Sequence, residues 1–388
     1  MSTVNNGPQI VRSGLVLDLD ASYMRSYSPN VMPNPTNIFA WSGTGNNNCT
    51  LSGDTTITRQ YGSIPLKMVM TGTDPYVGSY NSSIWNLAPA ASGQTWTLSF
   101  YAKGSETLTG NCYIFGANSG GVYIEAAATS FTVTTSWQRF TFTTTFSNAS
   151  TAFIQMRFGG SSGQVGKTIW WDGVQLERAS AATNFNPYYF GNTSWRDTSG
   201  NGYNGSLISS PVFSNTNGGN FSFNGTSQYV DCGNVLASLT NLSLECFVKF
   251  GTQSSLYGGV ISKTLSNANG WEIRVGASTS TTTDLQFRYV GDSAAIGFNS
   301  SFNNGTWYHI VVTGTSGSQK AYVNGIQNGS GTTALSPSAN SNSLLIGQLA
   351  YGSQKVNMTM ACARIYNKVL SPEEVMRNYQ ATKTRFGL

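Results

Sequence analysis

The stretch Thr95-Trp96-Thr97-Leu98-Ser99-Phe100-Tyr101-Ala102 alternates large apolar side chains with small hydroxyl side chains. Successive side chains of a β-strand point to opposite faces, so Trp96, Leu98 and Phe100 share one face. The pattern therefore predicts a strand with one buried face. The same alternation recurs in residues 136–142, 242–248, 271–275 and 285–289.

The composition also favours strands. The 388 residues include 43 glycines and only 10% charged residues, so serine, threonine, asparagine and glycine must supply most of the polar surface. These residue types suit turns and pleated sheets better than helices. The length exceeds what one hydrophobic core normally organises. We therefore predict an all-β protein with two antiparallel β-sandwiches.

Short sequence motifs also predict turns and one helix. Asn224-Gly225 and Asn324-Gly325 follow strand-like segments, and such pairs favour the tight turns of β-hairpins because both residues accept a positive φ. Ser371-Pro372-Glu373-Glu374 offers a capping hydroxyl, a proline at the first helical position and a glutamate placed for a capping box. We expect one short helix, close to the C-terminus.

A series of short motifs follows from residue 197 onward. The motifs are DTSGNGYNG at 197–205, FSFNG at 221–225, LECFV at 244–248, WYHIVV at 307–312, AYVNG at 321–325, LLIG at 344–347 and ARIYNKVLS at 363–371. In this order they resemble the laminin-G-like, concanavalin-A-like lectin sandwich. The resemblance implies a lectin-like jelly roll for this part of the chain.

A second set of motifs lies within residues 33–186. The segments IWWDGVQLE at 169–177 and AATNFNP at 181–187 resemble the closing strand and exit segment of jelly-roll carbohydrate-binding modules. Such modules occur in glycanases and in phage tail and head proteins. The resemblance implies a second jelly roll of the carbohydrate-binding-module kind.

The order of the motifs implies an insertion. In phage proteins that carry the lectin-like domain, an opening strand such as residues 13–21 usually runs, within a short stretch, into a turn motif like the one that begins here at Trp195. In this chain the turn motif arrives only after about 160 extra residues, which is the size of an ordinary domain. We therefore predict an N-terminal arm and a lectin-like domain interrupted by the second jelly roll. The predicted boundaries are 1–12 for the arm, 13–29 for the first strand, 30–187 for the inserted module and 188–388 for the remainder.

Charge and cysteine patterns exclude several classes of protein. The net charge is +5, but the basic residues are scattered, so nucleic acid is not an expected partner. The N-terminal residues have no apolar signal segment and no run is long enough to span a bilayer, so we expect synthesis in the host cytoplasm without a signal peptide and no membrane insertion. We interpret the five widely spaced cysteines as buried thiols.

Residues for acid–base catalysis are scarce. His309 is the single histidine and lies in a predicted strand, so we interpret it as a packed residue rather than a base. Glycoside hydrolases need two carboxylates about 5–10 Å apart. Glu245 and Glu272 each stand alone among apolar neighbours. We therefore expect that the protein is not an enzyme.

Structural calcium is the one cofactor that the resemblance leaves open. Calcium prefers carboxylate and carbonyl oxygens, and both families often hold an ion at a sandwich edge. The candidate ligands are Asp172 in the inserted module and Asp197 with Asn201 in the lectin-like domain. The alternative is that residues 197–202 form a hydrogen-bonded turn, because Asp and Asn side chains bind their own backbone.

Four aromatic residues are candidates for carbohydrate binding. Sugar rings stack on exposed aromatic faces, and neighbouring polar side chains bind their hydroxyls. Trp41, Tyr76, Tyr80 and Trp85 lie in segments rich in glycine, serine and asparagine. The alternative is that these side chains pack beneath long loops.

The combined resemblances favour a structural surface protein of a bacteriophage virion, as a capsid decoration or a tail or fibre component. Expected partners are capsid or tail subunits, further copies of the chain in an oligomer or array, and host surface polysaccharide. We expect the polar segment 1–12 to strap onto a neighbouring subunit. The alternative function is a bacterial cell-surface adhesion or glycan-binding accessory protein, which would carry a secretion signal or sorting tail.

Overall fold

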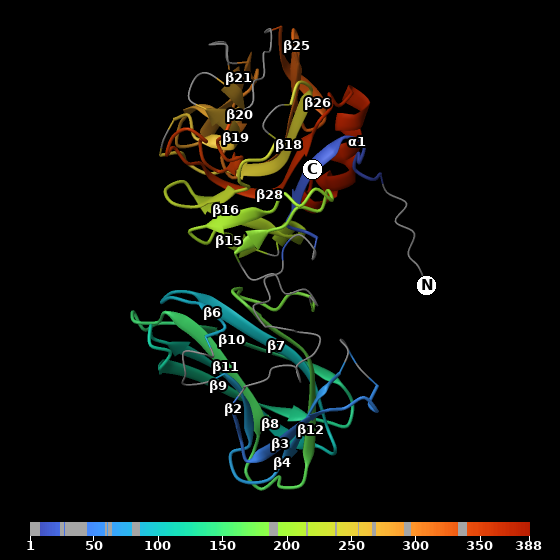
Figure 1. The fold of residues 1–388 in the computed structure, drawn as a ribbon, viewed down its shortest axis with the longest axis vertical. Coiled ribbons are helices and arrows are strands. Elements are labelled where there is room, and N and C mark those ends of the chain that lie inside the picture. Colours follow the sequence, from blue (N-terminus) through green and yellow to red (C-terminus); the bar gives the residue numbers. More distant parts are fainter. Residues whose placement is uncertain are drawn as a thin grey trace. The chain divides into compact units, whose positions relative to one another are not determined.

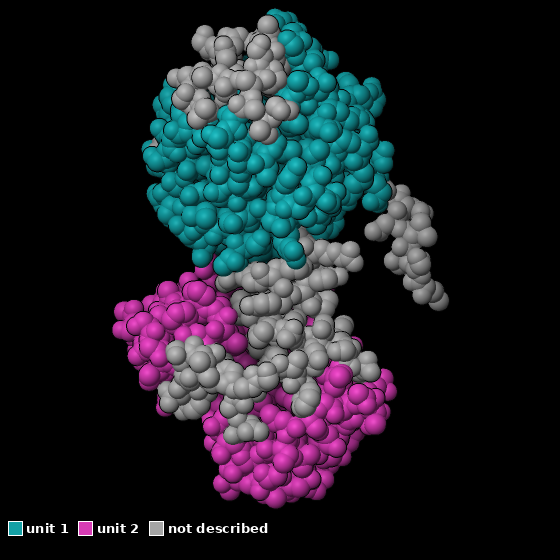
Figure 2. Space-filling model, in the orientation of Figure 1, with its two compact units in different colours: residues 1–27, 193–388 teal, residues 28–192 magenta. Residues whose placement is uncertain are grey.

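In the computed structural model the chain folds almost entirely into antiparallel strands (Figure 1), which confirms the predicted all-β class. Contacts divide the chain into two compact units (Figure 2): unit 1 is Met1–Tyr27 with Thr193–Leu388, and unit 2 is Ser28–Asn192. The structure describes residues 8–23, 27, 45–58, 60, 64–79, 86–185, 193–214, 216–236, 239–254, 256–265, 269–290, 296–332 and 340–388.

Unit 1 is a sandwich of two sheets. Sheet A contains β1 (Leu15–Asp20), β15 (Val212–Ser214), β16 (Asn220–Asn224), β18 (Leu242–Phe250), β24 (Trp307–Thr315), β25 (Ser318–Val323), β26 (Ile326–Gly331) and β28 (Asn357–Tyr366). Sheet D contains β13 (Ser194–Trp195), β14 (Gly205–Ile208), β17 (Tyr229–Asp231), β19 (Gly259–Leu265), β20 (Asn269–Ser278), β21 (Thr282–Val290), β22 (Ile296–Gly297), β23 (Phe302–Asn303) and β27 (Leu345–Ile346).

The core of unit 1 lies between these sheets. Leu244 and Cys246 of β18 meet Trp271 and Ile273 of β20 in one buried cluster. Because strand side chains alternate, the residues between them face outward from the sandwich. This alternation puts Glu245 on the outer face of sheet A and Glu272 on the outer face of sheet D.

The first strand of unit 1 comes from the other end of the chain. β1 pairs with β28, and its register joins Leu19 to Ala363 and Asp18 to Arg364. The segment before β1 is also buried: Ile10 and Val11 pack against side chains of sheet A and the C-terminal helix. The sequence analysis assigned these two residues to an N-terminal arm. They belong instead to unit 1, because their apolar side chains are buried against its sheet and helix. Residues 1–7 lie outside the described residues.

One short helix follows β28. Helix α1 (Pro372–Thr382) begins at Ser371, whose hydroxyl accepts a hydrogen bond from the Glu374 amide while Glu374 bonds back to the Ser371 amide. This is the predicted capping box. The short 3-10 segments are η3 (Thr216–Gly218) and η4 (Lys383–Phe386). No helix in the described part of the chain is long and apolar enough to cross a membrane.

Unit 2 is also a two-layer sandwich. Sheet B contains β3 (Cys49–Gly53), β4 (Leu66–Met70), β7 (Thr95–Gly104), β10 (Gln138–Thr145) and β12 (Thr168–Glu177). Sheet C contains β2 (Gly45–Asn47), β5 (Tyr76–Ser79), β6 (Ala88–Pro89), β8 (Leu108–Ala117), β9 (Tyr123–Val133) and β11 (Phe153–Gly160). Its core includes Phe100, Phe158 and Trp171, with the last two rings 4.3 Å apart.

The two Asn-Gly pairs have different roles. Asn324 and Gly325 both have positive φ, of 50° and 82°, and join β25 to β26 as a two-residue hairpin. The prediction of a hairpin at Asn224-Gly225 was wrong. β16 pairs within sheet A, whereas the next strand, β17, pairs within sheet D. The segment between β16 and β17 therefore crosses from sheet A to sheet D. It does so because β16 pairs with β28 and β17 pairs with β14 and β27, rather than with each other.

Candidate functional site

The outer face of sheet C carries a row of aromatic side chains. In β8, Cys112 and Ile114 point into the core, so Tyr113 and Phe115 lie on the outer face. Neighbouring strands extend this row. We call the following residues of β5, β11, β8 and β9 the aromatic strip: Tyr76, Arg157, Tyr113, Phe115 and Tyr123.

The aromatic strip is continuous across four strands. The rings of Tyr113 and Phe115 stack with centroids 5.7 Å apart and an interplanar angle of 3°. The ring of Tyr123, which is 40% exposed, lies 5.6 Å from that of Phe115. The Arg157 guanidinium lies 4.2 Å from the ring centroid of Tyr113 and 4.6 Å from that of Tyr76. Cation–π contacts of this kind hold the arginine in place.

Polar groups border the aromatic strip. The buried Gln155 side chain donates from Nε2 to Oδ1 of Asn86 at 2.9 Å and to the carbonyl of Gly121 at 2.8 Å. Nη1 of Arg157 lies 3.8 Å from a carboxylate oxygen of the exposed Asp74. Gln155 and Phe115 are buried, at 0% and 3% exposed, so the groups that reach the surface are the ring of Tyr123 and the carboxylate of Asp74, with Tyr76, Tyr113 and Arg157 partly exposed beside them. Rings with charged groups at their edge are the chemistry that binds the faces and hydroxyls of sugars.

Of the four predicted carbohydrate-binding residues, Tyr76 lies in the aromatic strip. Trp41, Tyr80 and Trp85 lie outside the described residues. The sequence analysis missed Tyr113, Phe115 and Arg157. Tyr113 and Phe115 could have been found from the segment Cys112–Phe115, in which apolar or aromatic side chains occupy both faces of one strand. A strand with this pattern has an outer face that is covered or binds something, rather than one that only contacts water.

The carboxylate of Asp172, the candidate metal ligand in unit 2, is buried in β12. Its Oδ2 accepts a hydrogen bond from the Gln60 amide at 3.1 Å, and its Oδ1 accepts from the Gly173 amide at 2.8 Å. Both oxygens thus bind backbone N–H groups. This arrangement ties the segment at residue 60 to the closing strand.

In unit 1 the second candidate metal site has the geometry of a turn. Oδ1 of Asp197 accepts from the amides of Asp18 and Ser199, each at 2.9 Å. Its Oδ2 accepts from the Ser199 hydroxyl and the Tyr203 amide. Asn201 donates to the carbonyl of Val16. These bonds favour the turn interpretation, and the described residues contain no group of three or more His, Cys, Asp or Glu side chains arranged for a metal.

The outer face of sheet A holds a buried ionic cluster. Arg364, whose side chain is 1% exposed, donates to Asp18 at 3.0 Å, to Asp20 at 2.6 Å and to Glu245 at 2.9 Å. We call these four residues the Arg364 cluster. More exposed arginines approach the same acids: Arg12 lies 3.1 Å from Asp18 and Arg385 lies 3.0 Å from Asp20.

Helix α1 completes this cluster from the other side. Glu245 accepts a hydrogen bond from Asn378 at 2.6 Å, and Nε2 of His309 lies 3.3 Å from its other oxygen. Burial alone would raise the pKa of Glu245, but the Arg364 charge and these hydrogen bonds outweigh it and lower the pKa to about 2. The expectation that Glu245 stands alone was therefore wrong, because strands distant in sequence bring charged partners to it.

The two glutamates cannot form one catalytic pair. Glu245 and Glu272 are both fully buried and lie on the outer faces of opposite sheets, with the core of unit 1 between them. Glu272 also has charged neighbours that the sequence did not reveal, since Nη1 of Arg274 and of Arg288 lie 3.6 and 3.9 Å from its carboxylate. His309 is buried between the rings of Phe247 and Tyr379.

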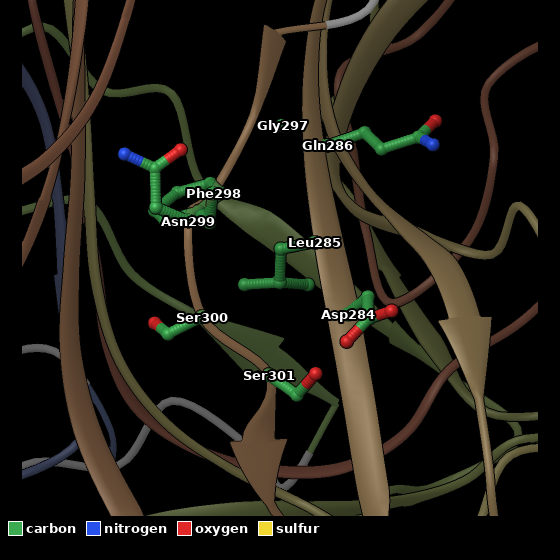
Figure 3. A pocket seen from close by; sticks show the side chains of 8 residues that line it. All are labelled: Asp284, Leu285, Gln286, Gly297, Phe298, Asn299, Ser300 and Ser301. Atoms are coloured by element: carbon green, nitrogen blue, oxygen red, sulfur yellow. The ribbon is translucent and has the colours of Figure 1, made fainter.

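A pocket of about 380 Å³ opens at the edge of sheet D (Figure 3). It forms where residues 298–301, between β22 and β23, leave the ladder of β21. Its lining is Asp284, Leu285, Gln286, Gly297, Phe298, Asn299, Ser300 and Ser301. In Figure 3 the Gln286 amide points away from Asn299. Phe298 packs against the core, so the pocket offers polar groups rather than a flat ring for stacking.

Residues 224–376 match the family model Laminin_G_3, described as the concanavalin A-like lectin/glucanases superfamily. Unit 1 therefore has the concanavalin A-like jelly-roll fold. The match lies within unit 1 and covers most of both its sheets. No curated protein matches the chain.

Several solved structures are similar to the chain. Domain 4 of AbnA, a GH43 extracellular arabinanase from Geobacillus stearothermophilus in complex with arabinotriose, has 20% identity over 48% of this chain and 92% of that chain, with a TM-score of 0.39. The receptor-binding domain of botulinum neurotoxin type G has 17% identity over 47% of each chain and a TM-score of 0.37. A heptameric SAP-like pentraxin from Limulus polyphemus has 19% identity over 40% of this chain and 79% of that chain, with a TM-score of 0.34.

Proposed function

We propose that the protein is a non-enzymatic glycan-binding protein and that the aromatic strip of unit 2 is its primary binding face. The observation that carries the proposal is the Arg157 guanidinium held between the rings of Tyr76 and Tyr113. This arrangement places a charged hydrogen-bond donor, 14% exposed, beside two aromatic rings on the outer face of sheet C. The lectin-like match of unit 1 supports the same class of function.

The physical basis is stacking combined with hydrogen bonding. The C–H face of a pyranose packs on a tyrosine ring, and the hydroxyl groups at its rim accept from arginine and exchange bonds with amides. A shallow face of this kind binds each sugar weakly. Useful affinity then requires several copies of the protein on one particle, because multivalency raises the effective concentration.

We further propose that this array is the surface of a bacteriophage virion, with the chain as a capsid decoration or a tail component. The support is the sequence resemblance of both jelly rolls to phage surface proteins, together with a surface of low charge, which weakens repulsion between copies. Mass spectrometry and electron microscopy of purified particles test this step. The chain should be present in many copies, and its absence from the particles would refute the virion role while leaving glycan binding open.

The absence of catalysis is part of the proposal. Glu245 and Glu272 are both fully buried, and the acids around Arg364 are neutralised by arginines, so no described acid pair of this kind faces a substrate. Incubation with host envelope polysaccharide should release no reducing ends. Release that is lost in Glu245→Gln or Glu272→Gln would contradict this statement.

Glycan binding is tested with the substitution Tyr113→Ala. A glycan array of bacterial surface polysaccharides identifies a ligand for the intact chain, and calorimetry measures its affinity. Removing the central ring should weaken binding about tenfold, since a well-packed aromatic contact contributes roughly 0.5–1.5 kcal/mol beyond its buried area. The matched control is Thr141→Ala, an exposed position in β10 of the opposite sheet. Equal affinity for the two variants would refute the aromatic strip as the binding face.

A further inference from the structure

Strand β9 forms one edge of sheet C in unit 2. Among the described strands it pairs only with β8, in a register that is regular from Glu125 to Val133. An antiparallel strand directs alternate pairs of backbone N–H and C=O groups to either side, so half of those in β9 face away from the sheet. No second strand in the described part of the chain binds these outward groups. They are therefore available to a strand from another molecule.

This edge lacks the features that normally prevent strands from pairing between molecules. Such features are lysine, proline, a bulge or an inward-pointing charge. Residues 126–133 read AAATSFTV and contain none of them. Glu125, just before this segment, is turned toward the neighbouring loop, where its Oε2 accepts from the amides of Ser147 at 2.9 Å and Asn148 at 3.2 Å. The edge is thus uncharged along its regular length.

The side chains of β9 leave room for a partner strand on both faces. The outer face has only small, exposed side chains, at positions 126, 128, 130 and 132. The inner face has Ala127, Thr129 and Phe131, each partly exposed. The Phe131 ring packs against the core, 4.5 Å from the ring of Phe140 on β10. The inner face therefore has one large ring and, four residues earlier, an alanine.

We propose that β9 pairs antiparallel with β9 of a second copy of this chain, about a two-fold axis at Thr129. Opposed residues must lie on the same face of the combined sheet, so the axis places one residue opposite its own copy. With the axis at Thr129, the Phe131 ring of each copy lies beside Ala127 of the other. An axis one residue earlier would oppose Phe131 to Glu125, and one residue later would oppose it to the larger Thr129.

A second copy fits this edge because the strand is complementary to itself. Reversing the strand brings an alanine to each phenylalanine, and no like charges meet, as an interface with two-fold symmetry requires. Pairing of this length exchanges about eight backbone hydrogen bonds. Strand pairing alone buries less than the roughly 800 Å² per partner of a standard interface, so we expect a dimer with a micromolar dissociation constant.

The dimer would also align the aromatic strips of the two copies. A two-fold axis between antiparallel strands is perpendicular to the sheet, so the outer faces of both copies stay on the same side. The two β8 strands would lie three inter-strand spacings apart, about 14 Å. Two aromatic strips would then share one surface and bind one glycan bivalently. This consequence rests on the glycan-binding function proposed above, whereas the interface itself does not.

Sedimentation velocity of the full chain, from about 1 to 100 μM, measures the dimer. Ala127→Lys places an ammonium group against Phe131 of the second copy, and should raise the dissociation constant at least about tenfold. The matched control is Thr141→Lys, which adds the same charge at an exposed position of β10, the edge strand of sheet B. It should leave the dissociation constant unchanged. Circular dichroism checks that both variants are folded.

Cysteine crosslinking tests the register without destabilising the edge. Thr129→Cys, in a Cys49→Ser background, places two thiols opposite each other, with Cα atoms about 4.5–5.5 Å apart, as a disulfide needs. Oxidation should convert most of this variant to a covalent dimer. The control is Thr132→Cys in the same background, since this exposed position lies six residues, about 20 Å, from its own copy. It should not crosslink.

Three results would overturn the proposal. These are a full chain that stays monomeric at about 100 μM, equal dissociation constants for Ala127→Lys and Thr141→Lys, or crosslinking of Thr129→Cys no greater than that of Thr132→Cys. None of these measurements uses a glycan. Failure here is therefore distinct from failure of the aromatic strip, which is judged by glycan binding of Tyr113→Ala.

Discussion

Replacing Arg364 with methionine should destabilise unit 1 strongly and leave unit 2 unchanged. Arg364 makes charge-assisted hydrogen bonds of 3.0, 2.6 and 2.9 Å to three buried carboxylates. Methionine is apolar, shorter and has no donor, so the three acids lose their shared cation. Removing one partner from a buried ion pair costs about 3–5 kcal/mol, because the remaining charge stays desolvated. The remaining contacts of Asp18 and Asp20 with Arg12 and Arg385 keep the expected loss within that range.

The matched control is Arg12→Met. Arg12 contacts the same acid, Asp18, at 3.1 Å, but its side chain is 56% exposed. An exposed pair contributes at most about 1 kcal/mol. The two variants therefore separate the effect of burial from the effect of losing one positive charge.

Native-state hydrogen exchange in increasing urea measures the effect in each unit. Amides of β18 and β28 report the free energy of unfolding of unit 1, and amides of β7 and β12 report that of unit 2 in the same molecule. We expect a loss of about 3–5 kcal/mol for β18 and β28 in Arg364→Met and none for β7 and β12. A loss below about 1 kcal/mol, or one equal to that of Arg12→Met, would refute the reasoning.

Three further predictions concern stability in acid, the turn at Gly325 and the reactivity of the cysteines. The pKa values of Asp20 and Glu245 are lowered, the latter from 4.5 to about 2, so these groups stabilise unit 1 above pH 4.5 and this stability should be lost as pH falls toward 2, measured by circular dichroism. Gly325→Ala should cost about 1 kcal/mol in urea unfolding because φ is positive there, whereas Gly297→Ala, with open space around it, should cost almost nothing. Cys49, the half-buried cysteine, should react first with a thiol reagent in the native protein, since burial raises the pKa of Cys112 and Cys362 to about 12.

The sequence predicted elements whose signals are local. Alternation predicted β7, β18, β20 and β21 because each has one face in a core, and the Ser371 capping box predicted the start of α1 because its hydrogen bonds span one helical turn. The Asn-Gly signal succeeded at Asn324-Gly325, where the flanking strands pair with each other. It failed at Asn224-Gly225, where tertiary pairing places the flanking strands in different sheets.

The candidate sites depend on which strands pair with one another, and no short stretch of sequence reveals that pairing. Arg364 is 346 residues from Asp18 and 119 from Glu245, and only the order of strands in sheet A brings them together. Similarly, the stack of Tyr76, Arg157 and Tyr113 requires β11 to lie between β5 and β8. The glycine- and serine-rich context of Tyr76 marks it as a candidate in the sequence, but its neighbours Arg157 and Tyr113 come from the strand register.

The Arg364 cluster also explains how β1 keeps its place in unit 1 although unit 2 interrupts the chain. Leu17 and Leu19 point into the core, while Asp18 and Asp20 point to Arg364. A slip of one residue against β28 would turn both carboxylates into the core and remove them from Arg364. Closing a longer loop costs little, about 0.6 kcal/mol for each doubling of a flexible loop. Register at a distant strand is thus held by charge on one face and apolar burial on the other, which is why a whole domain can be inserted after β1 without loss of the sandwich.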